Sequence, residues 1–192
     1  MIKRFLLFLL PLTILSFSTI SQVVNKQTYK SDTIWVTENF IIFGDTTIDR
    51  TKISYTASKF EPYISFEDYK SNILYKGAKA PINYSSNVTA RQFKTRIKET
   101  YKEEGLNFAG HYSFVSWGCG SPCKSSAIVD LITGKVYDGP SATLGYKFRK
   151  NSNMLIVNPP DSSGFFDDCP YCHPQIYIWD EKKKEFIEKK PK

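Results

Sequence analysis

The sequence predicts an α+β fold, in which a twisted antiparallel β-sheet packs against one main α-helix. Aromatic residues make up 15% of the chain, and many lie in short runs with isoleucine, valine and threonine, a composition that favours strands. Glycine, proline and asparagine separate these runs, which is typical of antiparallel hairpins. One segment, Ala90–Glu104, instead has the apolar spacing and the start and stop signals of a helix.

Short apolar runs predict strands on either side of the centre of the chain. Those before the helix are Thr33–Val36, Phe40–Phe43, Thr46–Tyr55, Pro62–Phe66, Asn72–Tyr75 and Ala80–Tyr84. Those near the C-terminus are Phe148–Lys150, Met154–Val157, Gln175–Trp179 and Glu185–Glu188. The stretch Asn158–Pro174 contains four prolines and predicts a long loop, which either is functional or is held by its cysteines.

The predicted helix Ala90–Glu104 has a signal at each end. Thr89 and Gln92 form a capping box, in which each side chain satisfies a free backbone N–H of the first turn. Gly105 ends the helix because it can adopt the left-handed conformation that a C-cap needs. An apolar stripe at helical spacing consists of Ala90, Phe93, Ile97 and Tyr101. We interpret this stripe as core contact with the sheet, and the sequence predicts no cofactor.

The segment Asn107–Pro140 predicts a three-stranded antiparallel meander. Its strands are His111–Trp117, Ser126–Leu131 and Lys135–Tyr137. Odd-numbered residues of the first strand share one face and even-numbered residues share the other. Two glycines and a proline follow this strand, and such residues interrupt strand pairing. We therefore expect a loop over Trp117–Cys123 that projects from the sheet.

Residues 1–21 have the features of a secretory signal peptide. A basic start is followed by an apolar run up to Leu15 and by small polar residues up to Ser21. The apolar run is shorter than the roughly 20 residues that a membrane-spanning helix needs, and no later segment is apolar enough to cross. We therefore expect an exported protein, periplasmic or secreted, whose residues 22–192 form a single domain.

The chain carries a formal net charge of +7, and removal of Lys3 and Arg4 with the signal peptide leaves +5. Much of the excess lies near the C-terminus, at Lys182, Lys183, Lys184, Lys189, Lys190 and Lys192. We interpret this run as a solvated turn and tail, with contact to an anionic envelope polymer as the alternative. The aromatic–basic pattern of a nucleic-acid-binding module is absent from the sequence.

The four cysteines form two close pairs in the sequence, Cys119 with Cys123 and Cys169 with Cys172. In an exported chain this pattern predicts two disulfides, for which three pairings are possible. A crossed pairing closes a longer loop and stabilises by roughly 4 kcal/mol, against roughly 2 kcal/mol for a local pair, on the chain-entropy model. Sequence proximity and the flexible Gly120 favour local pairs. We expect local pairs and keep the crossed pairings as alternatives.

Two other interpretations of the cysteines remain open. The C-x3-C and C-x2-C spacing is compatible with a four-cysteine zinc site, for which His111 or His173 could substitute as a ligand. The segment Cys169–Cys172 reads C-P-Y-C, the tetrapeptide of the glutaredoxin active site. That redox chemistry needs the first cysteine at a helix N-terminus, whereas the following His173-Pro174 disfavours a helix.

His111 is the candidate general base of a small hydrolase, with Asp130 as the carboxylate that orients it. The serines considered as its nucleophile are Ser113, Ser116 and Ser141. The sequence contains no nucleophile-elbow pattern. A structural histidine, hydrogen-bonded between strands, is the alternative interpretation.

Residues 107–140 resemble a group of exported bacterial proteins of unknown function. The shared pattern is N-F-A-G-H-Y, then W-G-C-G with a second cysteine, then D-x-x-T-G-K-V-Y. Phe93–Arg96 and Leu155–Pro159 also fit that group. The resemblance implies export and a shared fold, and it implies no established activity.

The predicted loop is also similar in architecture to that of Ivy-type periplasmic inhibitors of vertebrate lysozyme, which present a short cysteine-closed loop between two strands. Their loop is longer by one residue and carries a histidine that enters the lysozyme cleft. The segment Gly120–Pro122 has no counterpart of that histidine. The likeness is therefore one of architecture.

Together these features predict a non-enzymatic binding or inhibitory protein of the cell envelope that presents a rigid loop to its partner. Trp117 is the expected anchor of that interface. The residues expected to bind are Trp117, Gly118, Gly120, Ser121 and Pro122. A small hydrolase based on His111 and Asp130, or a zinc-binding domain that uses the four cysteines, are the alternatives.

Overall fold

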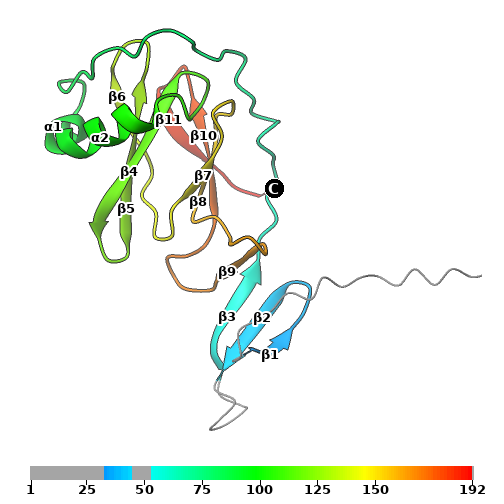
Figure 1. Cartoon of the computed structure of the whole chain (residues 1–192). Coiled ribbons are helices and arrows are strands. Elements are labelled where there is room, and N and C mark those ends of the chain that lie inside the picture. The colour runs from blue at the N-terminus through cyan, green and yellow to red at the C-terminus, as the bar shows by residue number, and fades with distance from the viewer. Residues whose placement is uncertain (1–32, 45–52, 192) are drawn as a thin grey trace, which may run out of the picture. The chain divides into compact units, whose positions relative to one another are not determined.

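Strands dominate the structure, a computed structural model that describes residues 33–44 and 53–191 (Figure 1). Strands take up 41% and helices 11% of it, so the fold is mainly β, and the α+β prediction is only loosely met. The strands form three antiparallel sheets, whereas the sequence predicted one. The predicted signal peptide, residues 1–21, lies outside the described residues. None of the described helices is both long and apolar enough to cross a bilayer.

The predicted meander is confirmed and is called the central sheet below. It contains β4 (Tyr112–Gly120), β5 (Cys123–Asp130) and β6 (Val136–Asp138), in that order. The predicted alternation is also confirmed, because Trp117 and Phe114 belong to clusters on opposite faces of β4. Both faces of the sheet are buried, which explains why β4 and β5 are apolar on both sides.

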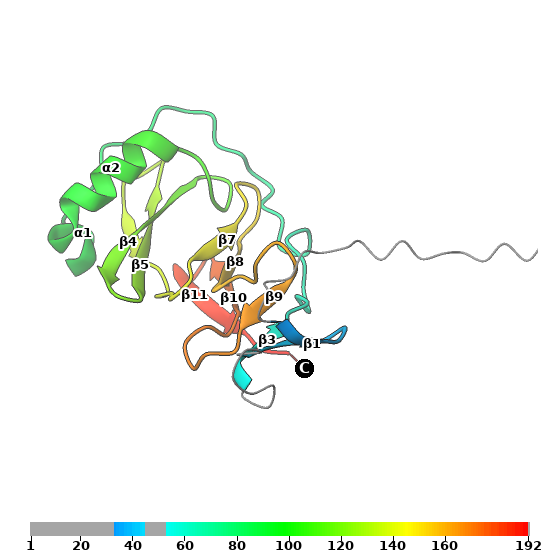
Figure 2. The same cartoon turned by 60° about the horizontal axis from the view of Figure 1, so that its bottom comes forward.

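Two helices, α1 (Val88–Gln92) and α2 (Lys94–Glu104), cover one face of the central sheet (Figure 2). The sequence predicted one continuous helix, but the chain leaves helical geometry at Phe93, with φ −112° and ψ 31°. Gly105 ends α2, as predicted, but its φ of 62° and ψ of −137° differ from the left-handed helical conformation that was expected. Three members of the predicted stripe, Ala90, Ile97 and Tyr101, are buried in the core, whereas the fourth, Phe93, is exposed.

The N-cap of α1 is Asn87, not the predicted Thr89. Asn87 Oδ1 accepts a hydrogen bond from the backbone N–H of Ala90 at 2.7 Å. Its Nδ2 donates to the carbonyl of Val136 and to Asp138 Oδ1, both at 3.2 Å. The capping-box prediction was wrong because asparagine caps helices as well as threonine does, and because Asn87 also bonds β6. The bonds to β6 cannot be read from the local sequence.

A second sheet, called the C-terminal sheet, packs against the other face of the central sheet. It has the strand order β11 (Glu185–Lys189), β10 (Gln175–Asp180), β8 (Met154–Val157) and β7 (Tyr146–Phe148). Three of its strands lie where predicted, whereas β7 begins two residues before the predicted strand Phe148–Lys150. The two sheets meet in a largely aromatic cluster whose largest members are Phe108, Tyr112, Phe114 and Trp179.

The third sheet, called the N-terminal sheet, contains β1 (Thr33–Val36), β2 (Phe40–Gly44), β3 (Ile53–Lys59) and β9 (Phe165–Asp167). Strand β9 lies inside Asn158–Pro174, so the prediction of an unbroken loop there was wrong. The predicted strand Thr46–Tyr55 overlaps β3, and its residues 46–52 lie outside the described residues. A small separate core holds this sheet together and consists of Ile41, Phe43, Ala57 and Phe165.

The segment between β3 and α1, residues 60–87, contains no strand. The predicted strands Pro62–Phe66, Asn72–Tyr75 and Ala80–Tyr84 were therefore wrong. Side chains of this segment instead cover the outer face of the C-terminal sheet, and they are Phe60, Ile64, Phe66 and Tyr69. Isolated bridges join Lys70 to Ser152 and Asn83 to Lys135. The apolar residues that suggested strands are packing contacts of a chain that follows the surface.

The start of α1 can be tested by comparing two neighbouring side chains. We expect Asn87→Ala to lower the free energy of unfolding by about 1–2 kcal/mol, because it removes the cap. Thr89→Ala should change it by less than about 0.5 kcal/mol. Urea denaturation followed by circular dichroism measures both values. A loss for Thr89→Ala that equals or exceeds the loss for Asn87→Ala would contradict this assignment.

Candidate functional site

The first disulfide closes the tip of the β4–β5 hairpin. Both strands continue to the tip, so the predicted loop Trp117–Cys123 is mostly strand. A register shift between Gly118 and Gly120 forms a bulge, and only Ser121–Pro122 makes the turn. The prediction was wrong because the glycines serve the bulge instead of ending the strand. The glycines and the turn residues are exposed, as a binding role requires.

Trp117 is not the exposed anchor that the sequence predicted. Its side chain is 8% exposed and lies in the core beneath the helices. Its ring centroid lies 4.9 Å from that of Phe93. Because β4 continues past Trp117, the alternation of the strand places this side chain beside Val115 on the helix-facing side. Trp117 therefore holds the hairpin to the helices and is not free to contact a partner.

The second disulfide joins Cys169 to Cys172, so both cysteine pairs are local, as expected. The chain runs from this turn into β10, not into a helix, so the arrangement required for glutaredoxin-like chemistry is missing. All four sulfur atoms are bonded in pairs, and none is a thiolate in this structure. In the part of the chain that the structure describes, no group of three His, Cys, Asp or Glu residues could hold a metal ion.

The two disulfide turns, far apart in the sequence, line one hollow of about 410 Å³, called the disulfide cleft. The first turn contributes Pro122 and Cys123, and the second contributes Pro170 and Tyr171. The remaining lining residues are Ser141, Ala142, Thr143, Asn158, His173 and Gln175. The structure thus brings the two cysteine motifs to one hollow while each keeps its own local disulfide.

Asn158 fixes the geometry of the disulfide cleft. Its Oδ1 accepts hydrogen bonds from the backbone N–H groups of Thr143 at 2.7 Å and Leu144 at 2.9 Å. Its Nδ2 donates to the carbonyls of Tyr171 at 3.0 Å and His173 at 3.4 Å. The side chain is 5% exposed in total, so all its polar capacity is used inside the protein. Asn158 therefore ties the second disulfide turn to the segment that follows β6.

That segment is in turn fixed to the first hairpin. Lys124 and Ala142 exchange a pair of backbone hydrogen bonds of 2.8 and 2.9 Å. The hydroxyl oxygen of Tyr146 lies 2.9 Å from the carbonyl oxygens of both Lys124 and Pro140, which share its one hydrogen. The two disulfide turns are therefore linked through a continuous set of hydrogen bonds within the chain.

The lining of the disulfide cleft includes no lysine, arginine, aspartate or glutamate. His173, which lines the cleft, has its Nε2 3.6 Å from Asp168 Oδ1. Tyr171 stands at the edge and is 76% exposed, more than any other large apolar side chain in the described residues. The cleft therefore presents an exposed aromatic ring beside two prolines, with little charge.

His111 and Asp130 do not form the predicted catalytic pair. Both Asp130 oxygens are bonded within the β5–β6 turn, to the backbone N–H of Ile132 at 2.9 Å and to the hydroxyl of Thr133 at 2.7 Å. His111 Nε2 instead lies 3.5 Å from Glu181 Oε1. A hollow of about 250 Å³ beside this pair is also lined by Ser71.

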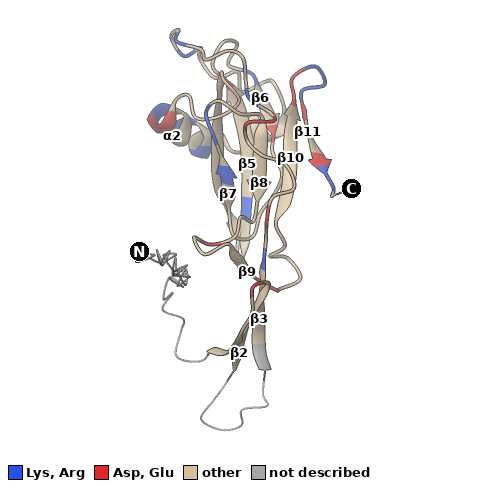
Figure 3. Ribbon diagram, turned by 90° about the vertical axis from the view of Figure 1, so that its right-hand side faces the viewer, with Lys and Arg blue, Asp and Glu red and all other residues tan. Residues whose placement is uncertain are grey.

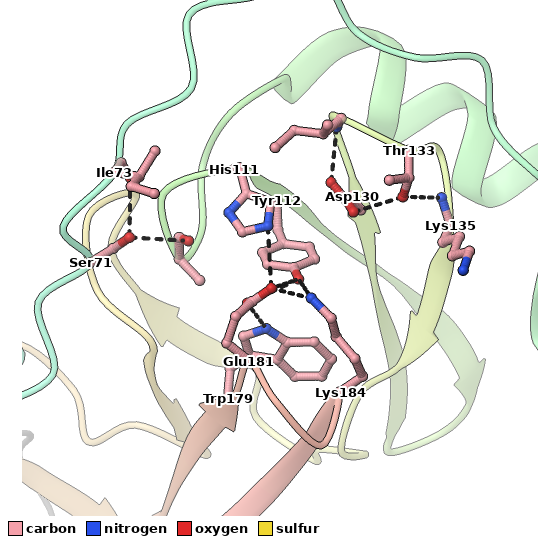
Figure 4. A network of polar contacts seen from close by, with 12 residues as sticks. Ser71, Ile73, His111, Tyr112, Asp130, Thr133, Lys135, Trp179, Glu181 and Lys184 are labelled. Atoms are coloured by element: carbon pink, nitrogen blue, oxygen red, sulfur yellow. Dashed lines mark hydrogen bonds and ion pairs between the residues drawn. The ribbon is translucent and has the colours of Figure 1, made fainter.

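Glu181 is the centre of a polar network between the two packed sheets (Figure 4). Tyr112 donates its hydroxyl hydrogen to Oε1 at 2.8 Å, and Trp179 Nε1 donates to Oε2 at 2.8 Å. Lys184 also donates to Oε1, and its Nζ lies 2.9 Å from the Tyr112 hydroxyl. Lys184, predicted as part of a solvated run, is therefore bound into the network, while Lys182 and Lys183 are exposed.

The network lowers the pKa of Glu181 and raises the pKa of Tyr112. Burial alone raises the pKa of Glu181, but hydrogen bonds from Lys184, Tyr112 and Trp179 outweigh burial and hold the pKa below its ordinary value. Burial, together with the neighbouring carboxylate, raises the pKa of Tyr112 above its ordinary value. At neutral pH the network therefore consists of an ionised Glu181 and a protonated Tyr112.

Two site residues could not be predicted from local sequence. Asn158 has a φ of 51°, which asparagine tolerates better than most residues, and it follows a buried strand. An asparagine directly after the apolar run Met154–Val157 is the part of this that can be read from the sequence. Glu181 lies in a charged turn among lysines, and no local feature distinguishes it from a solvated glutamate.

Comparison with known proteins gives no match: neither a protein-family model, nor a curated protein, nor a solved structure matches this chain. Its function is therefore inferred from the residues of the site.

The charge of Glu181 can be tested by the pH dependence of stability. Because its folded-state pKa lies below the ordinary value of 4.5, the ionised carboxylate stabilises the fold above that pH. This stabilisation is lost as the pH falls through the lowered pKa. We expect Glu181→Gln to be less stable than wild type at pH 7, and the difference to shrink below pH 4.5.

Urea denaturation at a series of pH values measures this difference. Glu103, exposed on α2, is the matched control, and Glu103→Gln should leave stability unchanged within about 0.5 kcal/mol at pH 7. A stability difference between wild type and Glu181→Gln that stays constant down to pH 2 would show that the charge is not responsible.

Proposed function

We propose that this chain is an exported, non-enzymatic binding or inhibitory protein of the cell envelope, and that its partner binds at the disulfide cleft. The observation that carries this proposal is that two local disulfides hold their turns on the same hollow. The exposed ring of Tyr171 at its edge takes the anchoring role that Trp117 cannot fill. Because disulfides and hydrogen bonds within the chain hold the cleft, association loses little conformational entropy.

Export is supported by the sequence and by the sulfur chemistry. Residues 1–21 have the pattern of a signal peptide, and both cysteine pairs are oxidised. The resemblance of residues 107–140 to uncharacterised exported bacterial proteins favours the same compartment. The hairpin closed by Cys119–Cys123 also shares its architecture with Ivy-type lysozyme inhibitors, which favours an inhibitory role by analogy alone.

The chemistry of the cleft favours a protein partner over an anionic envelope polymer. A polymer of that kind needs a concentration of basic residues, and the cleft lining contains none. Elsewhere lysines and arginines are interspersed with acidic residues, as on α2 and β11 (Figure 3). Pro122, Pro170 and Tyr171 give the cleft an apolar surface, which is typical of the centre of a protein interface.

The proposal is tested by binding to proteins extracted from the envelope of the source cells. We expect Tyr171→Ala to weaken binding of the captured partner by about tenfold or more, the loss typical of an aromatic anchor. The control Trp35→Ala removes another exposed ring, 61% exposed on β1, and should bind as wild type does. Biolayer interferometry with the purified partner measures the affinities.

The dependence of the binding affinity on salt concentration is a second test of the proposal. Binding through an uncharged cleft should change by less than about threefold between low and high salt, because there is little charge to screen. The proposal fails if Tyr171→Ala and a Cys169→Ser/Cys172→Ser variant bind every envelope partner as tightly as wild type. It also fails if binding is lost at high salt and anionic polymers compete for it.

A second candidate function, a small hydrolase, is favoured by one observation. His111 is 16% exposed in its side chain and lies beside the carboxylate of Glu181, in a hollow that Ser71 also lines. In this arrangement Glu181, in place of the predicted Asp130, would orient the imidazole as a general base toward water or the Ser71 hydroxyl. Ser71 Oγ lies 3.1 Å from the carbonyl of Ile73, to which it donates its hydrogen.

The hydrolase candidate is tested with a panel of p-nitrophenyl esters. If His111 is the base, we expect His111→Gln to lower the rate by about a hundredfold or more. His173→Gln, at the other histidine of the chain, is the control and should leave the rate unchanged. Hydrolysis by wild type no faster than the blank, or equal rates for both variants, would remove this candidate.

A further inference from the structure

A further cavity shares no lining residue with the disulfide cleft or with the hollow beside His111. It is a groove of about 830 Å³, called the edge groove, and its lining includes residues of β6 and β11, which are edge strands of their sheets. Its walls come from β6, from the start of β11 and from the segment before α1. The volume is within the range of about 300–1,000 Å³ that is typical of ligand sites.

The floor of the edge groove is aromatic. Tyr137, Tyr177 and Phe186 are half-buried there, at the margin of the cluster between the two sheets. The hydroxyls of both tyrosines have no hydrogen-bond partner among the described residues, in contrast to the Tyr112 and Tyr146 hydroxyls. Burial raises the pKa of both groove phenols, so they stay protonated and can donate as well as accept hydrogen bonds.

The charges of the edge groove are balanced. Lys135 and Asp138 line it on the β6 side, and Lys184 and Glu185 line it on the β11 side. Lys184 already binds Glu181, so the groove has no surplus of positive charge for an anionic ligand. Asp138 Oδ1 accepts from Asn87, and the hydrogen bonds of Asp138 leave Oδ2 as a further acceptor. The groove therefore offers donors and acceptors without selecting for charge.

A peptide that adds as a strand does not fit the β6 side of the edge groove. Such binding needs free backbone groups on the edge strand. The carbonyl of Val136 already accepts from Asn87 Nδ2 at 3.2 Å, and its N–H donates to Ser86 Oγ at 3.1 Å. The N–H of Asn83 donates to the carbonyl of Gly134 at 2.8 Å. The segment before α1 thus occupies the edge that a peptide would need.

From this geometry we infer that the edge groove binds an uncharged oligosaccharide. The apolar C–H face of a sugar ring packs on the rings of Tyr177 and Phe186, as apolar groups pack on aromatic faces. Tyr137 contributes its hydroxyl, since Lys184 Nζ lies over its ring, 5.9 Å from the centroid. Sugar hydroxyls both donate and accept, and so match the two phenols and the free oxygen of Asp138. This site does not depend on the disulfide cleft or on its partner.

The inference is tested on the full chain with uncharged tetrasaccharides of β-linked N-acetylglucosamine, of glucose and of mannose, by isothermal titration calorimetry. We expect at least one of them to bind. Tyr137→Phe and Tyr177→Phe keep the rings and remove only the hydroxyls, so each should weaken binding by about threefold to tenfold. Tyr177→Ala also removes a stacking face and should weaken binding by more than about tenfold.

Tyr171→Ala, in the disulfide cleft, is the matched control and should bind the tetrasaccharide as wild type does. A failure of all three uncharged tetrasaccharides to bind would overturn the inference. So would binding that is confined to an anionic tetrasaccharide of glucuronate, or binding that survives Tyr137→Phe, Tyr177→Phe and Tyr177→Ala unchanged. Because the phenylalanine variants keep the core filled, a loss of binding in them is not a loss of folding.

Discussion

The packing of the central sheet against the C-terminal sheet depends on the hydrogen bonds that the carboxylate of Glu181 accepts. Tyr112 from β4 and Trp179 from β10 are 0% and 1% exposed, and they fill the centre of the cluster between the sheets. Each carries a polar hydrogen that would be costly to bury without a partner. Glu181 accepts from both, and its own charge is compensated by Lys184. Glu181, a partly exposed residue at the edge of the cluster, thus allows the rings of Tyr112 and Trp179 to be buried in the core.

This network and the disulfide cleft lie at opposite ends of the same strands. Strand β4 begins at Tyr112, in the network, and ends at the hairpin that the first disulfide closes. Strand β10 begins just after the second disulfide and ends beside Glu181. At about 3.3 Å per residue, the nine residues of β4 separate the two ends by roughly 25–30 Å. The cleft can therefore present its turns on a rigid support, because the far ends of its strands are held together by the network.

The parts of the fold that were predictable are those whose signals are local. The meander, the C-cap at Gly105 and the strands Met154–Val157 and Gln175–Asp180 follow from turn residues and alternation. The division into three sheets depends on pairings such as β3 with β9, more than a hundred residues apart, which have no local signal. Trp117 was predicted to be exposed because its surroundings also lack a distinguishing local signal. Glycines at positions 118 and 120 suit a bulge within a strand as well as an irregular loop, so composition does not separate the two. Asn158 and Glu181 act through partners that only the folded chain brings near them.

The pairing of the cysteines shows what the disulfides contribute. A local ring such as Cys119–Cys123 stabilises the fold by roughly 2 kcal/mol on the chain-entropy model, and a bond from Cys119 to Cys172 would give roughly 4 kcal/mol. The observed pairing is thus the less stabilising one. A crossed bond, however, would join the two turns directly to each other. Two local bonds stiffen each turn separately and leave Asn158 to set the distance between them through hydrogen bonds. The disulfides therefore serve the shape of the cleft more than the stability of the chain, which is the expected arrangement if the cleft receives a partner.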